Sequence, residues 1–188
     1  MTPEQNHVFV GHLQEGRLAS GFAAARADLA ENPNSPHAHV ALAHCFLLAG
    51  HPHGALDEAT AAMALSGNET GCVFLRARAH YILRNFESAH VDAMAVVSQS
   101  IAGGADHLLN SGRLLAAAAL IELDRTKEAM ELLVLTPADA FIDAGRLITR
   151  SETIVAAAAR FTASFPTHPL SIDPYSVSSN QPHSESVA

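Results

Sequence analysis

The chain has 188 residues, of which 48% are hydrophobic and 5% are aromatic, and it contains no tryptophan. This is enough for one domain with a substantial core, and the many alanines favour helices packed closely on one another. The net charge of −8 disfavours nucleic acid as a partner, and the longest apolar run, Leu114–Ile121, is too short to cross a membrane.

The predicted elements are helices that recur with a fixed spacing. The clearest anchor is Gly50, which is followed by alanines at positions 55, 59 and 62. The same register lies 34 residues earlier, 34 residues later, and another 40 residues after that. The corresponding sets are Gly16, Gly21, Ala25 and Asp28; Arg84, Ala89, Ala93 and Val96; and Asp124, Ala129, Leu133 and Thr136. We therefore predict four copies of one unit, at 2–35, 36–69, 70–103 and 110–143.

Turn residues divide each predicted copy into a helix A and a helix B. Between copies, the breaks are Asn32–Pro36, Ser66–Asn68 and the pair Gly103-Gly104. Within copies, the A-to-B turns are Glu15-Gly16, Gly50-His51-Pro52, Arg84-Asn85 and Asp124-Arg125.

Two further segments follow the predicted copies. Residues 138–161, with Phe141, Ala144, Leu147, Ile148 and Ile154, read as one or two helices that cap the array. The helical domain is therefore predicted to span 1–161. Residues 162–188 contain four prolines and many serines, which predicts a flexible tail.

The 34-residue spacing resembles the tetratricopeptide repeat (TPR), a unit of two antiparallel helices with small residues where they cross. The small positions are filled by Ala43, Ala77 and Ala117 in helix A, and by Gly21, Ala55, Ala89 and Ala129 in helix B. Phe9, Asp28 and Pro52 depart from the pattern. The resemblance implies an all-α solenoid of about four helical hairpins plus a C-terminal capping helix, similar to small bacterial adaptors and secretion chaperones.

The resemblance also implies a concave groove, lined by the A helices, that binds a peptide or a helix of another protein. The candidate groove residues carried over are Asn6, His7, Val10, His37, His44, Leu48, Phe74, Leu75, Arg78, Tyr81, Leu114 and Ala118. The walls are mostly apolar, and Arg78 near the centre, with His44 one helix away, suits a carboxylate. The subclass that grips acidic C-termini through a carboxylate clamp is rejected, because its cationic positions are occupied here by residues such as Val10 and Leu75.

Several alternatives remain open at this stage. The apolar groove could instead be covered by the C-terminal segment, or it could pair two copies of the chain. Twelve histidines, among them His37, His44, His51 and His53, raise the possibility of a metal site, but no ligand pattern surrounds them. No catalytic motif is present, so we expect a cytoplasmic binding protein, not an enzyme, without cofactor or metal.

Overall fold

The structure is a computed structural model that describes residues 17–103 and 106–163. Within these ranges, eight helices and a two-stranded antiparallel sheet follow one another along the chain. The elements are α2 (Leu18–Glu31), α3 (Pro36–Leu48), α4 (Pro52–Ser66), α5 (Thr70–Ile82), α6 (Phe86–Gly103), α7 (Asp106–Glu122), α8 (Thr126–Val134), β1 (Phe141–Asp143), β2 (Leu147–Thr149) and α9 (Arg150–Ala163). The described part of the chain is thus mainly helical, in agreement with the predicted fold class.

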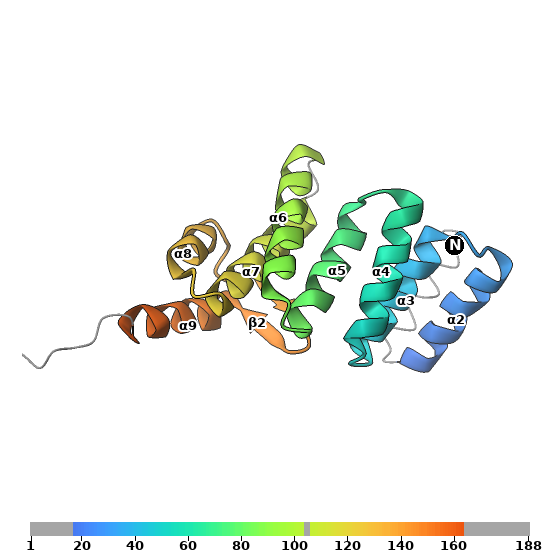
Figure 1. Cartoon of the computed structure of the whole chain (residues 1–188), viewed down its shortest axis with the longest axis horizontal. Helices are drawn as coiled ribbons and strands as arrows, with labels where there is room; N and C mark the ends of the chain where they lie inside the picture. Colours follow the sequence, from blue (N-terminus) through green and yellow to red (C-terminus); the bar gives the residue numbers. More distant parts are fainter. Residues whose placement is uncertain (1–16, 104–105, 164–188) are drawn as a thin grey trace, which may run out of the picture.

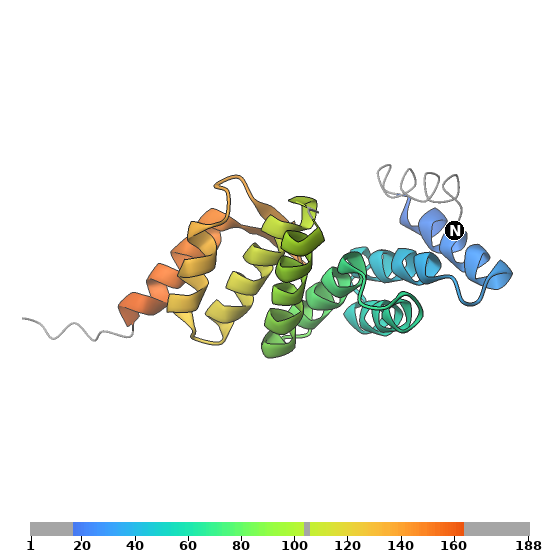
Figure 2. The same ribbon diagram turned by 90° about the horizontal axis from the view of Figure 1, so that it is seen from above.

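The helices stand side by side in a row, with α2 and α9 at opposite ends (Figure 1, Figure 2). Each of the helices α2 to α8 packs against the helix that follows it in the chain. Helices α3, α5 and α7 also contact one another in that order, and α9 contacts both α7 and α8. No helix in the described ranges is both long enough and apolar enough to cross a membrane.

The turns α3–α4, α5–α6 and α7–α8 have the same backbone geometry. In each turn one residue has a positive φ, at 73° for Gly50, 63° for Arg84 and 59° for Asp124. The N–H of that residue donates to the carbonyl three residues back, and the next N–H donates to the carbonyl five residues back, which is the Schellman arrangement that ends a helix. The bonds are Gly50 to Leu47 and His51 to Phe46, Arg84 to Tyr81 and Asn85 to His80, and Asp124 to Ile121 and Arg125 to Leu120. These three predicted turn positions are confirmed, whereas Glu15-Gly16 lies outside the described residues.

Two residues that departed from the expected pattern have local roles. The Asp28 side chain on α2 is buried and accepts a hydrogen bond of 2.9 Å from the hydroxyl of Ser35. The Ser35 oxygen in turn accepts from the backbone N–H of Ala38, so that it caps the start of α3. Pro52 occupies the first turn of α4, where its missing N–H costs nothing.

The segment 138–161 differs from its prediction. Instead of one or two helices, it forms a β-hairpin, β1 and β2, and then the single helix α9. Ile142 pairs with Ile148 across the hairpin, and both side chains are buried. Phe141 and Leu147 point outward, with exposed fractions of 65% and 57%. This alternation has a period of two, so the apolar residues that we read at helical spacing belong to two faces of a strand pair.

The boundaries of the fourth predicted copy and of the tail also shift. The extra residues before position 110 were predicted to form a link, but α7 begins at Asp106 and includes most of them. Helix α9 continues to Ala163, slightly past the predicted domain boundary at 161. The remainder of the predicted tail lies outside the described residues.

Candidate functional site

The predicted groove residues fall into three groups in the structure. Asn6, His7 and Val10 lie outside the described residues. On α3, His37 and Leu48 are exposed, and His44 is partly buried. The third group comes from α5 and α7, and most of its side chains are buried. It comprises Phe74, which is partly buried, and Leu75, Arg78, Tyr81, Leu114 and Ala118, which are buried.

The hairpin explains why the third group does not form an open groove. Ile142 and Ile148 share one apolar cluster with Tyr81, Leu114 and Ala118. Strand β1 packs against α7 and β2 against α9, and the hairpin turn at Gly145 approaches Ile82 of α5, so the hairpin covers this side of the array. The hairpin lies alongside these helices in Figure 1. Leu114 is fully buried in this cluster and so cannot line an open groove, whereas Tyr81 and Ala118, although mostly buried, border a small pocket of about 180 Å³ together with Arg146 and Glu122. Their role in binding a partner stays a prediction. The sequence had left open that a C-terminal segment folds into the groove.

Arg78, the predicted anchor for a partner's carboxylate, is a buried cation in the structure. Its side chain is 9% exposed, its guanidinium carbon lies 5.9 Å from the centre of the Phe74 ring, and its Nε has no hydrogen-bond partner. Burial lowers the pKa of the Arg78 guanidinium, and the carboxylate of Asp143 on the hairpin opposes that shift. The pKa of His44 is also lowered, first by burial and then by Arg78. The chain's own Asp143 thus acts on Arg78 electrostatically, and the role of Arg78 as an anchor for a partner's carboxylate stays a prediction.

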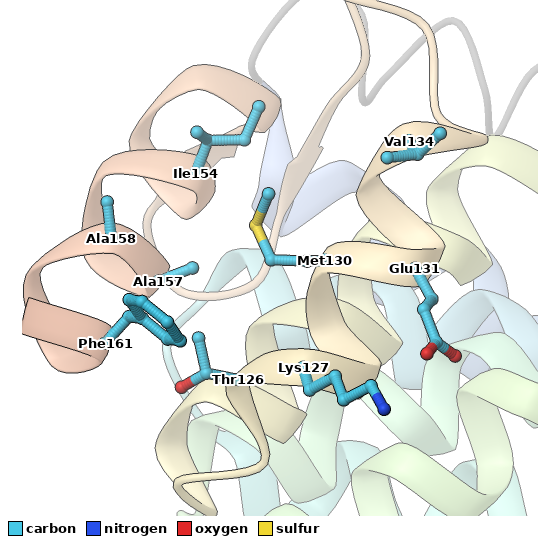
Figure 3. Close-up of a pocket in the computed structure, with 9 residues that line it drawn as sticks. All are labelled: Thr126, Lys127, Met130, Glu131, Val134, Ile154, Ala157, Ala158 and Phe161. Atoms are coloured by element: carbon cyan, nitrogen blue, oxygen red, sulfur yellow. The ribbon is translucent and has the colours of Figure 1, made fainter. Parts of the chain in front are cut away.

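An open apolar groove, which we call the end groove, lies between α8 and α9. It has a volume of about 560 Å³ and is bordered by the last two helices of the described array. The end groove is lined by Thr126, Lys127, Met130, Glu131, Val134, Ile154, Ala157, Ala158 and Phe161. Figure 3 shows Met130 extending from α8 toward α9, whereas Lys127 and Glu131 extend from the other side of α8. Val134 is 72% exposed at one end of the groove.

Polar contacts outside the end groove hold its two walls in place. At the start of α9, the Thr149 hydroxyl accepts from the N–H of Glu152, while the Glu152 carboxylate accepts from the N–H of Thr149, which is a capping box. Arg150 donates from Nε to the carbonyl of Leu133 at the end of α8. Near the other end of α9, Arg160 donates to Asp124 at 2.7 Å and to Glu122 at 3.0 Å. The walls are therefore anchored at both ends, which leaves the apolar residues between them as a preformed surface.

Sequence reasoning missed the end groove because it treated 138–161 only as a cap. The apolar residues of α8 and α9 were recognised, but their pattern does not show which of them remain exposed. Seven of the eleven strongly exposed large apolar side chains in the described residues fall between Met130 and Phe161. This concentration at one end of the molecule could have been anticipated only by asking what covers the last helix pair.

The described residues do not place potential metal ligands close together. In residues 17–103 and 106–163, no three side chains among His, Cys, Asp and Glu converge as metal ligands would. His39 instead contacts Glu58, at 2.6 Å between Nδ1 and a carboxylate oxygen. Both cysteines, Cys45 and Cys72, are buried as free thiols.

No protein-family model matches the chain, and no curated protein matches it at a significant level. The functional argument therefore rests on the geometry of the chain itself.

Proposed function

We propose that the chain is a protein-interaction module of the TPR-like helical-repeat type, and that its docking surface is the end groove. Three equivalent turns, spaced 34 and 40 residues apart, support the repeat. Four fully buried alanines follow the same spacing, namely Ala43, Ala77, Ala117 and Ala157. Because Ala157 lies on α9, this helix takes the place of helix A in a fifth, incomplete repeat. It contacts α7 and α8, the two preceding helices, as α7 contacts α5 and α6, although α9 packs less extensively on α8 than α7 does on α6.

The open apolar surface of the end groove carries the functional proposal. Folded monomers rarely leave a contiguous apolar groove of this kind in water, and such grooves commonly receive a peptide or an amphipathic helix. The groove has the few polar groups at its edge that orient a partner, Lys127 and Glu131. The proposed role is therefore that of an adaptor or chaperone-like protein that holds another polypeptide.

A second candidate surface is the open part of the originally predicted groove on α3. Leu48 is 44% exposed there, and Arg78 lies nearby as a buried cation with an unpaired Nε. An acidic peptide that displaced or joined Asp143 would find a complementary charge at this place. Leu48 is the one strongly exposed large apolar side chain on α3, whereas several apolar side chains line the end groove, so we rank the α3 surface second.

Quantitative affinity capture distinguishes the two surfaces. The full-length chain, the double variant Val134→Glu/Ala158→Glu and the variant Leu48→Glu are used as baits under identical conditions. All three substitutions replace exposed side chains, so far-UV circular dichroism should remain unchanged. We expect partner recovery to be lost with the double variant and retained with Leu48→Glu. Equal recovery by all three baits would refute the end groove as the docking surface, and the reverse pattern would favour α3.

A further inference from the structure

We infer that the occupant of the end groove is a second copy of this chain, so that α8 and α9 of two molecules form a two-fold symmetric four-helix interface. This inference rests on the proposed function, because it names the partner for the same groove. Homodimers with a two-fold axis are the commonest assemblies of soluble proteins, and paired helical hairpins are an established way to build a four-helix bundle.

The first argument is that the array is incomplete at α9. Helices α3, α5 and α7 are each covered by the helix that follows, α4, α6 and α8 respectively. Helix α9 is the last helix of the described residues, and on its side facing α8 it leaves the end groove open. The sequence after Ala163 has prolines at positions 166, 169 and 174, a spacing that disfavours a further covering helix. A helix from another molecule satisfies the same apolar requirement.

The second argument is that the same two helices also supply the ridge that fills such a groove. Val134 on α8 and Phe161 on α9 are 72% and 58% exposed, and both line the end groove. Outside α8 and α9, the strongly exposed large apolar side chains of the described residues are Leu135, Phe141 and Leu147 in the segment between these two helices, and Leu48, Leu65, Val91 and Ile101 on α3, α4 and α6. Groove and ridge therefore occupy one patch, which is the condition for a closed two-fold contact rather than an open chain of subunits.

The third argument is the charge at the edge of the groove. Lys127 and Glu131 are one helical turn apart on α8, and both are exposed. When two α8 helices approach in antiparallel fashion about a two-fold axis, Lys127 of each copy faces Glu131 of the other. Both ion pairs form at once, so the patch is complementary to itself in charge as well as in shape.

Sedimentation equilibrium of the full-length chain over about 1 to 100 µM tests the inference. We expect a concentration-dependent mass that approaches twice that of one chain. Val134→Glu/Ala158→Glu should remain monomeric, and the matched control Val91→Glu, at a residue 59% exposed on α6, should dimerise like the unmodified chain. Either single charge reversal, Lys127→Glu or Glu131→Lys, should weaken the dimer by about tenfold, and the double reversal should restore it.

Cross-linking locates the contact. Lys127 is the only lysine in the sequence, so it carries the only side-chain amine that a carbodiimide can join to a nearby carboxylate. With an equal mixture of ¹⁴N- and ¹⁵N-labelled chains, we expect a Lys127–Glu131 cross-link between light and heavy peptides. Cross-links confined within one isotope type, with a chain that stays monomeric throughout, would overturn the inference.

Oligomeric state and partner capture together distinguish a failure of the second-copy inference from a failure of the proposed docking surface. The full-length chain could prove monomeric and still capture a protein that the Val134→Glu/Ala158→Glu variant does not capture. That result would overturn the second copy as the occupant and leave the proposed docking surface in place. A monomeric full-length chain that dimerises once residues 164–188 are removed would instead assign the groove to that segment. A dimer that Val91→Glu disrupts as strongly as Val134→Glu/Ala158→Glu would place the interface elsewhere.

Discussion

At the positive-φ position of each of the three equivalent turns, glycine should give a higher free energy of unfolding than alanine, and by the same amount at all three. Gly50, Arg84 and Asp124 all adopt the left-handed conformation, although their side chains are unrelated. For a residue with a Cβ, this conformation costs about 1 kcal/mol relative to glycine. A Cβ added at Gly50 would meet no atom within 4 Å, so the penalty there is purely conformational. We therefore expect Gly50→Ala to lower the free energy of unfolding by about 1 kcal/mol.

The other two turns provide matched pairs at equivalent positions. At Arg84, the glycine variant should be more stable than the alanine variant by about 1 kcal/mol, and the same difference should appear at Asp124. Both variants at Asp124 also lose its hydrogen bond to Arg160, so each should be less stable than the unmodified chain. The comparison between glycine and alanine at one site cancels such side-chain losses, which leaves the backbone contribution.

Guanidinium chloride denaturation, followed by far-UV circular dichroism, measures these differences. A change of 1 kcal/mol corresponds to a shift in Tm of about 3 °C for a chain of this size. Ala27, exposed within α2, is the control, because Ala27→Gly in a helix should lower stability by about 1 kcal/mol, which is the opposite order. If alanine were as stable as glycine at all three turn positions, the shared turn geometry, and with it the main support for the repeat, would be wrong.

Two further predictions concern titratable groups. Burial lowers the pKa of three imidazoles, His44, His80 and His90, from the ordinary value of 6.5, so the unfolded chain binds protons more readily than the folded one. Stability should therefore be fully present above about pH 6.5 and fall as the pH decreases through the lowered pKa values, which denaturation curves at several pH values can measure. Burial also raises the pKa of Cys45 to about 11 and raises that of Cys72. At about pH 8, Cys45 should react with a thiol reagent about a hundredfold more slowly in the native chain than after unfolding, and Cys72 should also react more slowly; fast native reaction would contradict their burial.

The sequence was sufficient to predict the helices and the turns between them. The turns at Gly50, Arg84 and Asp124 could be found because each interrupts an apolar pattern at a recurring interval. The small residues at helix crossings were equally predictable, since Ala43 and Ala77 recur at the same spacing and are fully buried. Such features depend on residues close in sequence and on steric limits that the residue type itself sets.

The hairpin could not be predicted from the same signals, although its sequence carried a partial one. The isoleucines Ile142 and Ile148 and the β-branched Thr149 favour strands, and Gly145 adopts a φ of 78° in the connecting turn. Over so short a segment, apolar residues at helical spacing and at alternating spacing coincide, and the helical context favoured the first reading. The packing of the hairpin on α5 and α7 depends on contacts between segments that are distant in sequence, which no local pattern specifies.

The need to cover apolar helix faces explains both the burial of predicted groove residues on α5 and α7 and the candidate site on α8 and α9. An apolar face of a helix pair has to be covered, and the segment that covers it decides whether the face is core or docking surface. Over α5 and α7 the hairpin provides that cover, with Asp143 contributing a charge opposite to Arg78. Over α8 and α9, the described residues provide no such segment, and Val134 remains 72% exposed. The proposed binding surface therefore lies where the described residues leave apolar side chains uncovered, at the α8–α9 end of the array and not at its centre.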